Sequence, residues 1–318
     1  MDSLKLLESL EEKLKTHPDD LGTAKSIAKF YQKLNPAINH ATNYFIKMYQ
    51  DKNRNLFYKE LAQKNTQNKD VMEIGTGLGL IAYYILQTKP SYFMTCELNR
   101  HSFLKAEEFF KTNNLLDKLV LLNKSSFEIF YPEDTEKKFD FIIHELFASN
   151  PFAEGFLPII MNAKRLLKTQ GKFLPGIFKL KAIPVNYINH QFDGVKNELK
   201  QLNLDCYNNY YENQLISLDQ NIEITTKANS ITVFEIDLNS DFKLNDQFIL
   251  KKDTLAGFDG LIVYFQAIEG DMILSNYNDE DSNYICDHWG SSIFVLNNKH
   301  LKNIEFQYDR TKLEIKPL

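Results

Sequence analysis

The sequence is poor in cysteine, and this narrows where the protein can work. Only three cysteines occur in 318 residues, Cys96, Cys206 and Cys286, and their spacing matches neither a metal-binding motif nor a disulfide framework. A sparse and odd count of this kind favours a reducing compartment. We therefore predict a cytoplasmic protein, with the nucleus as the alternative location.

Long apolar runs are lacking as well. No stretch reaches the about 18 consecutive apolar residues of a membrane span, so we expect no membrane partner. Residues 1–20 carry several acids and lack the apolar centre of a secretory signal. The net charge of −5 argues against direct nucleic-acid binding and favours a basic partner. With 43% hydrophobic residues, the chain can bury the core of one large domain or of two.

The chain is organised around residues 71–97. Residues 71–74 predict a short buried strand, 80–87 an apolar helix, and 92–96 a second strand that ends at the acid Glu97. Between the first strand and the helix lie three alternating glycines, Gly75, Gly77 and Gly79. This order is typical of a nucleoside site in an open α/β sheet, where the acid accepts hydrogen bonds from the ribose.

The spacing of the glycines indicates which nucleoside binds. A dinucleotide turn has the pattern G-x-G-x-x-G, and here Leu80 occupies the place of the third glycine. Glu73 puts a carboxylate just before the turn, where it would repel a pyrophosphate. We therefore predict S-adenosylmethionine as the cofactor, with a nicotinamide cofactor and a ligand-free glycine turn as alternatives.

Residues 43–63 predict one or two helices ahead of this unit. Met48, Asp51 and Arg54 recur every three residues, so they share one helix face. Arg54 is placed to meet an anion, for which the carboxylate of an amino-acid cofactor is one candidate. A solvated arginine on a surface helix is the other interpretation.

Polar residues recur where later strands end. Strands predicted at 119–122 and 139–144 are followed by Ser126, Glu128 and Glu145. Ligands in open α/β sheets bind beyond the carboxyl ends of the strands, so one crevice could collect these residues with Glu97. There Glu128 could accept a hydrogen bond from the adenine amino group.

Two acids flank a tight loop after the last of these strands. Glu145 and Glu154 are nine positions apart, with Pro151 between them. Alone, they would be two acids in a loop. Beside a cofactor crevice, two carboxylates favour a planar bidentate cation, and guanidinium matches best.

The two ends of the chain have other patterns. Residues 1–38 predict a helical hairpin, either a fragment like a tetratricopeptide repeat or a cap on the main body. From about 176 onward the apolar period changes to two, which predicts an antiparallel sheet or barrel. Residues 188–215 interrupt it as a helical and tyrosine-rich arm, suited to a protein contact or packed on the barrel. His288, just before a late strand, could be no more than a hydrogen-bonded, half-buried residue.

Together these motifs resemble those of protein arginine methyltransferases, over about residues 40–318. The matching positions, in chain order, are Met48, Asp51, Arg54, Glu73, Gly75, Gly77, Gly79, Glu97, Glu145, Glu154, Asp287, His288 and Trp289. Asp287 departs from the family pattern, which has threonine there. The loop between the two glutamates is nearer to the monomethylating and tandem-domain branches, which favours monomethylation.

The resemblance implies a Rossmann-like methyltransferase domain (39–175) and an antiparallel β-barrel substrate domain (176–318). It also implies a homodimer formed through the 188–215 arm, and methyl transfer from S-adenosylmethionine to arginine side chains of protein substrates. A methyltransferase for a non-arginine or small-molecule substrate, and a binding protein with weak catalysis, are the alternatives.

The resemblance also gives the site residues roles. Those expected to bind the cofactor are Met48, Arg54 (its carboxylate), Glu73, Gly75, Gly77, Gly79, Glu97 (its ribose), Ser126 and Glu128 (its adenine). Glu145 and Glu154 would clamp the substrate guanidinium. Asp51 and His288 would pair beside it, and Asp287 and Trp289 would border the substrate pocket.

Overall fold

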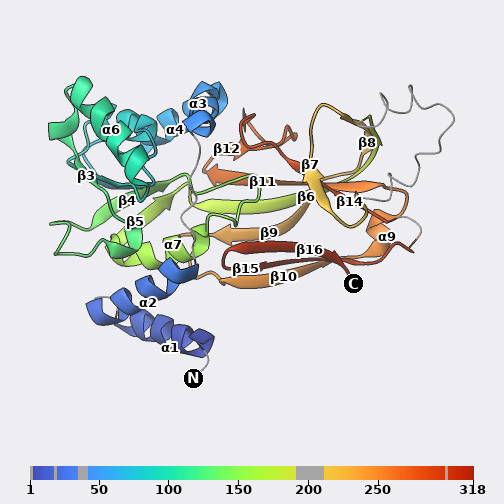
Figure 1. Ribbon diagram of the computed structural model, residues 1–318, viewed down its shortest axis with the longest axis horizontal. Helices are drawn as coiled ribbons and strands as arrows, with labels where there is room; N and C mark the ends of the chain where they lie inside the picture. The colour runs from blue at the N-terminus through green and yellow to red at the C-terminus, as the bar shows by residue number, and fades with distance from the viewer. Residues whose placement is uncertain (1–2, 18–19, 35–41, 191–210, 298–299) are drawn as a thin grey trace.

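The computed structural model describes residues 3–17, 20–34, 42–190, 211–297 and 300–318. A part made of helices and a parallel sheet lies beside a part made almost entirely of strands, and a helical hairpin lies against the first part (Figure 1). This is the order of parts that the sequence predicts.

The parallel sheet carries the motifs singled out in the sequence. Its five described strands lie in the order β3-β2-β1-β4-β5, and all neighbours are parallel. The strands are β1 (Asp70–Ile74), β2 (Tyr92–Cys96), β3 (Val120–Leu122), β4 (Phe139–His144) and β5 (Leu167–Leu174). The helices α5 (Leu80–Gln87) and α6 (Arg100–Thr112) follow β1 and β2. Apolar strands suit the sheet centre, and Ile142 and Ile143 in β4 are fully buried.

The strand β5 corrects the sequence-based expectation. By their sequence, residues 156–167 predict a helix and residues 171–176 a turn out of it. In the structure α7 spans Phe156–Ala163, a 3₁₀ turn covers Lys164–Leu166, and β5 begins at Leu167. β5 is an edge strand, and much of it is exposed, so it lacks the apolar pattern that marks the central strands. Its pairing with β4 makes it a strand.

Two helices precede the sheet and meet at one residue. The helices α3 (Thr42–Gln50) and α4 (Lys52–Asn65) are separated by Asp51. Asp51 has extended backbone angles, and its carboxylate accepts a hydrogen bond from the Arg54 N–H at 3.0 Å. It is thus the N-cap of α4, a position that favours aspartate.

The strand-rich part contains two sheets. Its strands are β6 (Ile177–Asn189), β7 (Leu215–Ser217), β8 (Ile222–Lys227), β9 (Ile231–Asp237), β10 (Asn245–Leu250), β11 (Gly260–Glu269), β12 (Met272–Ser275), β13 (Tyr284–Ile285), β14 (Ser292–Val295), β15 (Ile304–Asp309) and β16 (Lys312–Pro317). A short helix, α9 (Lys252–Leu255), lies among them. The pairs are antiparallel as expected, except that β12 and β13 are parallel. β6 and β11 pair over nine residues and bury Phe178, Leu180 and Phe265.

The N-terminal hairpin consists of α1 (Ser3–Thr16) and α2 (Leu21–Leu34). Leu7, Ala24 and Ile27 are buried, and α2 contacts α7 and the 3₁₀ turn η2 (Ser126–Glu128). Lys25 pairs with Glu133 at 3.0 Å on the surface. The hairpin therefore packs on the α/β part, as the interpretation as a cap predicts.

Two further expectations concern the middle of the chain and membranes. Of the arm predicted at 188–215, residues 191–210 lie outside the described residues; 188–189 belong to β6 and 215 to β7. Among the helices that the structure describes, none has the length and apolar character needed to cross a bilayer.

Candidate active site

A cavity of about 550 Å³ lies at the carboxyl ends of the central strands. Gly75 follows β1, Glu97 follows β2 and Glu145 follows β4, and all three line it. The strand order changes direction between β1 and β4, which is where open α/β sheets bind ligands. The volume is in the range of small-molecule sites.

The glycine turn forms one wall of this cavity. Gly75 and Gly77 have φ angles of +87° and +54°, which residues other than glycine rarely adopt. Because glycine has no side chain, the backbone itself can contact a ligand here. Gly79 has another role. A Cβ on Gly79 would lie 2.8 Å from the Phe110 ring in α6, so this glycine permits close packing of two helices and is not part of the cavity lining.

Glu97 is fixed by two backbone donors. Its two carboxylate oxygens accept hydrogen bonds from the N–H groups of Gly77 and Asn99, both at 2.8 Å. Each carboxylate oxygen can accept more than one hydrogen bond. Glu97 can therefore stay held in place and still accept from two ribose hydroxyl groups.

Glu73 differs from the expectation that its charge faces the ligand. It is 1% exposed beneath the turn and does not line the cavity. Burial raises the pKa of Glu73 to about 8, although a hydrogen bond from Thr95 at 2.6 Å opposes that rise. At neutral pH this carboxyl group is therefore mostly uncharged, and the argument that it repels a pyrophosphate is wrong.

After β3, the cavity is lined by Ser126 and by Phe127, an aromatic residue that the sequence analysis did not select. Ser126 lines the cavity as expected, and Phe127 beside it is buried and lines it too. Glu128 is exposed, and its carboxylate accepts from the Ser125 N–H at 3.3 Å. Phe127 thus adds an apolar side chain to the wall of the cavity. The only signal in the sequence was its place at a strand end.

Arg54 and Glu145 form an ion pair in the wall of the cavity. Arg54 is 1% exposed, and its Nε donates to Glu145 at 2.7 Å while Nη2 donates to the other carboxylate oxygen. Burial alone would lower the pKa of Arg54, but Glu145 raises it above its ordinary value. A buried guanidinium requires an acid nearby, and Glu145 supplies it. The expectation that Arg54 binds a cofactor carboxylate stays a prediction.

Glu154 lies in the same lining as Glu145. Gly155, directly after it, has a φ angle of +67° and is the N-cap of α7, so the loop turns sharply at this point. The side chains of both glutamates therefore border the cavity that the glycine turn lines. Tyr49 also lines it, and its hydroxyl oxygen accepts from the Leu80 N–H at 3.2 Å; we did not predict it.

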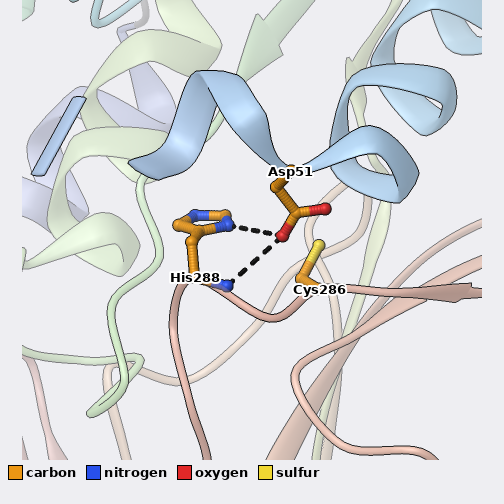
Figure 2. Close-up of side chains that lie close together, drawn as sticks. All are labelled: Asp51, Cys286 and His288. Atoms are coloured by element: carbon orange, nitrogen blue, oxygen red, sulfur yellow. Dashed lines mark hydrogen bonds and ion pairs between the residues drawn. The ribbon is translucent and has the colours of Figure 1, made fainter. Parts of the chain in front are cut away.

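Asp51 and His288 meet across the two parts of the molecule. The Nδ1 atom of His288 lies 2.9 Å from Asp51 Oδ2, and both side chains are buried (Figure 2). The same oxygen accepts from the N–H groups of Asp287 and His288. Burial raises the pKa of Asp51, but hydrogen bonds from His288 and from backbone N–H groups outweigh it and hold the pKa at about 2.

The neighbours of His288 point in different directions. Trp289 is 4% exposed and lines the cavity, and its carbonyl accepts a hydrogen bond from Ser149 in the loop between the two glutamates. The Asp287 side chain is exposed and is not part of the cavity lining. Its backbone N–H is turned toward Asp51, and the expectation that Asp287 borders the substrate pocket stays a prediction.

Comparison with known proteins gives relatives for this arrangement. Over 161 residues the chain is 29% identical to protein arginine N-methyltransferase 9 of Xenopus laevis, covering 50% of this chain and 19% of that protein. It is 27% identical over 140 residues to the histone-arginine methyltransferase CARMER of Anopheles gambiae, covering 43% and 22%. No protein-family model matches.

Solved structures agree in fold. Arabidopsis thaliana protein arginine methyltransferase 10 superposes with a TM-score of 0.62 at 17% identity, covering 87% of this chain and 96% of that one. The Trypanosoma brucei PRMT1 enzyme–prozyme complex gives 0.62 at 16%, covering 85% and 90%. In sequence and in fold, this chain is similar to protein arginine methyltransferases.

The predicted resemblance and fold class are thereby confirmed. The protein arginine methyltransferase fold accounts for the parallel sheet followed by the strand-rich part. The chain spans about a fifth of the length of the curated relatives that it matches. Of the residues on which the resemblance in the sequence rests, eight line one cavity: Met48, Arg54, Gly75, Gly77, Glu97, Glu145, Glu154 and Trp289.

Proposed function

We propose that this chain transfers methyl groups from S-adenosylmethionine to guanidino nitrogens of arginine side chains in protein substrates. One observation carries the proposal: Glu145 and Glu154 line the same cavity as Gly75, Gly77 and Glu97. A nucleoside site and two acids suited to a guanidinium are thus contiguous. The similarity to protein arginine methyltransferases supports the same reaction.

The residues present fit S-adenosylmethionine. The positive φ angles of Gly75 and Gly77 leave room for close approach, and Glu97 is oriented to accept from a ribose. Phe127 contributes an apolar wall suited to an adenine, and Arg54, which lines the cavity and contacts Glu145, is a cation suited to an amino-acid carboxylate. When bound, the cofactor would supply an electrophilic methyl group on a sulfonium. A solved relative is described in complex with AdoHcy.

The two glutamates would prepare the substrate. An arginine guanidinium has a pKa above about 12, so it arrives protonated and is a poor nucleophile. Arg54 uses one acceptor site on each oxygen of Glu145, and each oxygen keeps another. Glu145 and Glu154 would bind the guanidinium N–H groups, hold the positive charge away from one terminal nitrogen and orient that nitrogen.

The Asp51–His288 pair would manage the proton. Asp51 fixes the His288 ring through Nδ1, and it stays ionised because its pKa is about 2. An imidazole held by a carboxylate can accept a proton as the methylated guanidinium forms. Trp289, next to His288, would border the substrate side of the cavity.

The test is mass spectrometry of peptides incubated with the purified protein and S-adenosylmethionine. Arginine–glycine peptides should gain methyl groups, and matched peptides with lysine in place of arginine should not. Methylation of lysine peptides, or of small molecules only, would contradict the substrate class. The loop resemblance supports monomethylarginine as the product, which the fragment masses distinguish from dimethylarginine.

A cofactor-binding protein without turnover is the second candidate. The observation that favours it is the Arg54–Glu145 ion pair, because it engages one of the two acids that a substrate requires. Calorimetry that detects S-adenosylmethionine binding, together with no methyl transfer to any peptide, would support this candidate over the first.

We also propose the domain limits 1–38, 39–175 and 176–318, and a homodimer through the arm at 188–215. The break between β5 and β6 at residues 175–176 supports the second limit. A solved relative that forms a heterotetrameric complex supports assembly. Limited proteolysis should cut near the first limit. Analytical ultracentrifugation should show that the wild type is a dimer. The triple variant Tyr207→Ser, Tyr210→Ser and Tyr211→Ser should be a monomer, and a monomeric wild type would contradict the proposal.

A further inference from the structure

Three different metal-binding side chains converge where the two parts of the molecule meet. Asp51, Cys286 and His288 each offer one ligand atom, and these atoms lie within 4.8 Å of one another. Asp51 comes from the break between α3 and α4, and the other two from the segment between β13 and β14 (Figure 2). Asp51 is 8% exposed, Cys286 2%, and the His288 side chain 2%.

We propose that Asp51, Cys286 and His288 form a zinc-binding site that switches the protein off. Carboxylate, thiolate and imidazole are the three ligand types that Zn²⁺ uses, and three of them leave a fourth position open. Hard cations such as Mg²⁺ prefer oxygen ligands, so the thiol selects against them. Nothing in the spacing of the cysteines predicts this site, because its ligands come from segments more than 230 residues apart.

The geometry requires small movements. Zinc bonds of about 2.0–2.3 Å arranged as a tetrahedron separate neighbouring ligand atoms by about 3.3–3.6 Å. Asp51 Oδ2 and His288 Nδ1 are 2.9 Å apart, so they need to separate by only a few tenths of an ångström. The Cys286 sulfur points toward the Asp51 carboxylate, so side-chain rotation can bring it into range (Figure 2).

The charges also balance. On binding, the Cys286 thiol loses its proton to solvent, and the resulting thiolate and the Asp51 carboxylate together neutralise Zn²⁺. His288 stays neutral: the proton on Nδ1, which is shared with Asp51, moves to Nε2 by exchange with solvent, and Nδ1 then donates its lone pair to the metal. Arg54, the nearest buried cation, does not repel the ion strongly because its charge is paired with Glu145.

Occupancy of the site would stop the reaction. A zinc ion between Asp51 Oδ2 and His288 Nδ1 replaces their hydrogen bond, and His288 can no longer take up a proton through the orientation that Asp51 gives it. This consequence rests on the proposed function, whereas metal binding itself does not.

Cobalt(II) replaces zinc in such sites and reports its ligands by absorption. Added to the full chain after treatment with a chelator, Co²⁺ should give a thiolate charge-transfer band and the visible bands of a tetrahedral ion, both removed by Zn²⁺. Cys286→Ser should abolish the thiolate band. The matched control, the double variant Cys96→Ser and Cys206→Ser, should retain it with Cys286 as the sole thiol.

Two results would overturn the site: no thiolate band in the wild type, or a band that persists in Cys286→Ser. Circular dichroism checks that this variant is folded. Should it fail to fold, His288→Gln provides the second variant and should weaken Co²⁺ binding by at least about tenfold. Unchanged binding in His288→Gln would equally overturn the site.

A methyl-transfer assay tests the switch. Zn²⁺ should inhibit the wild type, a chelator should restore it, and Cys286→Ser should need at least about tenfold more Zn²⁺ for the same fractional inhibition relative to its own metal-free rate. Wild-type turnover that is insensitive to Zn²⁺, with the cobalt spectrum present, would refute the switch. A protein that transfers no methyl group would refute the proposed function, and the cobalt spectrum would still decide the metal site.

Discussion

Three glutamates within or just after neighbouring strands have different surroundings. Glu97 accepts from two backbone N–H groups, and Glu145 is paired with a buried guanidinium. Glu73 has one hydroxyl donor and no solvent, and its Oε1 atom is buried without a hydrogen-bond partner. A buried carboxyl group keeps its charge only where donors or cations replace water. Burial therefore holds Glu73, whose pKa is raised to about 8, mostly protonated at neutral pH.

Glu73→Gln should remove a pH dependence of stability. An unfolded glutamate ionises near 4.5 whereas the folded one does so near 8, so between these values the native state binds the extra proton. The free energy of unfolding of the wild type should therefore fall as pH rises from 4.5 to 8, by of order 1 kcal/mol per pH unit. Urea denaturation at pH 6 and pH 8 measures this.

The control for that experiment is Glu136→Gln, which alters an exposed acid. Glu136→Gln should follow the wild-type pH dependence, while Glu73→Gln should be flatter and relatively more stable at pH 8. Identical slopes for Glu73→Gln and the wild type would show that the buried carboxyl group is not the source.

The two loop glutamates should respond differently to substitution. Glu145→Gln leaves the buried Arg54 charge without its partner and should lower the free energy of unfolding by about 3–5 kcal/mol. Glu154 is half-buried beside the cavity, so Glu154→Gln should change stability little. Thermal or chemical denaturation of the two variants compares them directly, and equal destabilisation would contradict the ion pair's structural role.

Turnover should depend on Glu154 nonetheless. Glu154→Gln should still bind S-adenosylmethionine by calorimetry and lose about 10²–10³ in kcat, because a charged acceptor for the guanidinium is gone. Glu108→Gln, an exposed acid in α6 outside the cavity lining, is the control and should keep the wild-type rate. Undiminished turnover in Glu154→Gln would refute the guanidinium clamp.

At the scale of elements, the glycines of the turn have two different roles, ligand access and helix packing, which the sequence motif alone does not distinguish. Gly75 and Gly77 line the cavity, whereas Gly79 is the N-cap of α5 and lets this helix pack on α6. Asp51 similarly serves both as the N-cap of α4 and as the acceptor for His288. A helix start is well suited to such double use because its fixed backbone orients the capping side chain.

Gly79→Ala should destabilise the protein more than Gly257→Ala, a substitution that introduces backbone strain but no steric overlap. Both Gly79 and Gly257 have positive φ angles, of +98° and +86°, but only at Gly79 would a new Cβ overlap a neighbour, the Phe110 ring. Gly79→Ala should therefore cost about 1–3 kcal/mol more than Gly257→Ala. Chemical denaturation of both variants tests this, and equal losses would show that α6 gives way freely.

At the scale of the whole molecule, separate segments close around the cavity. The segment from β13 to β14 reaches the break between α3 and α4 through Asp51 and His288. Two further hydrogen bonds join the same parts: Asn53 donates to the Ile285 carbonyl at 2.9 Å, and the Tyr284 hydroxyl donates to Glu60 at 3.0 Å. The strand-rich part thereby places Trp289 in the cavity wall.

The hairpin at the N-terminus should be held by apolar burial and not by its surface ion pair. Ile27 is 2% exposed in the core, so Ile27→Ala should cost about 2–4 kcal/mol. Lys25 and Glu133 are about half exposed, and Lys25→Ala should cost less than about 1 kcal/mol. Denaturation together with proteolysis of residues 1–34 tests this, and a larger loss from Lys25→Ala would reverse the interpretation.

The sequence by itself determined the central strands, the glycine turn and the identity of the acids at the strand ends. Those features follow from local periodicity and from backbone angles that only glycine adopts readily, and the strands at 92–96 and 139–144 match the structure. The edge strand β5 did not follow, because its residues alternate too weakly and its hydrogen bonds come from β4.

Only the tertiary structure decided how the charged groups are used. Which acid meets Arg54, whether Glu73 carries a proton, and that Cys286 lies beside Asp51 and His288 all depend on groups far apart in the chain. The physical reason is that burial removes water, after which a charge persists only if the fold brings it a partner.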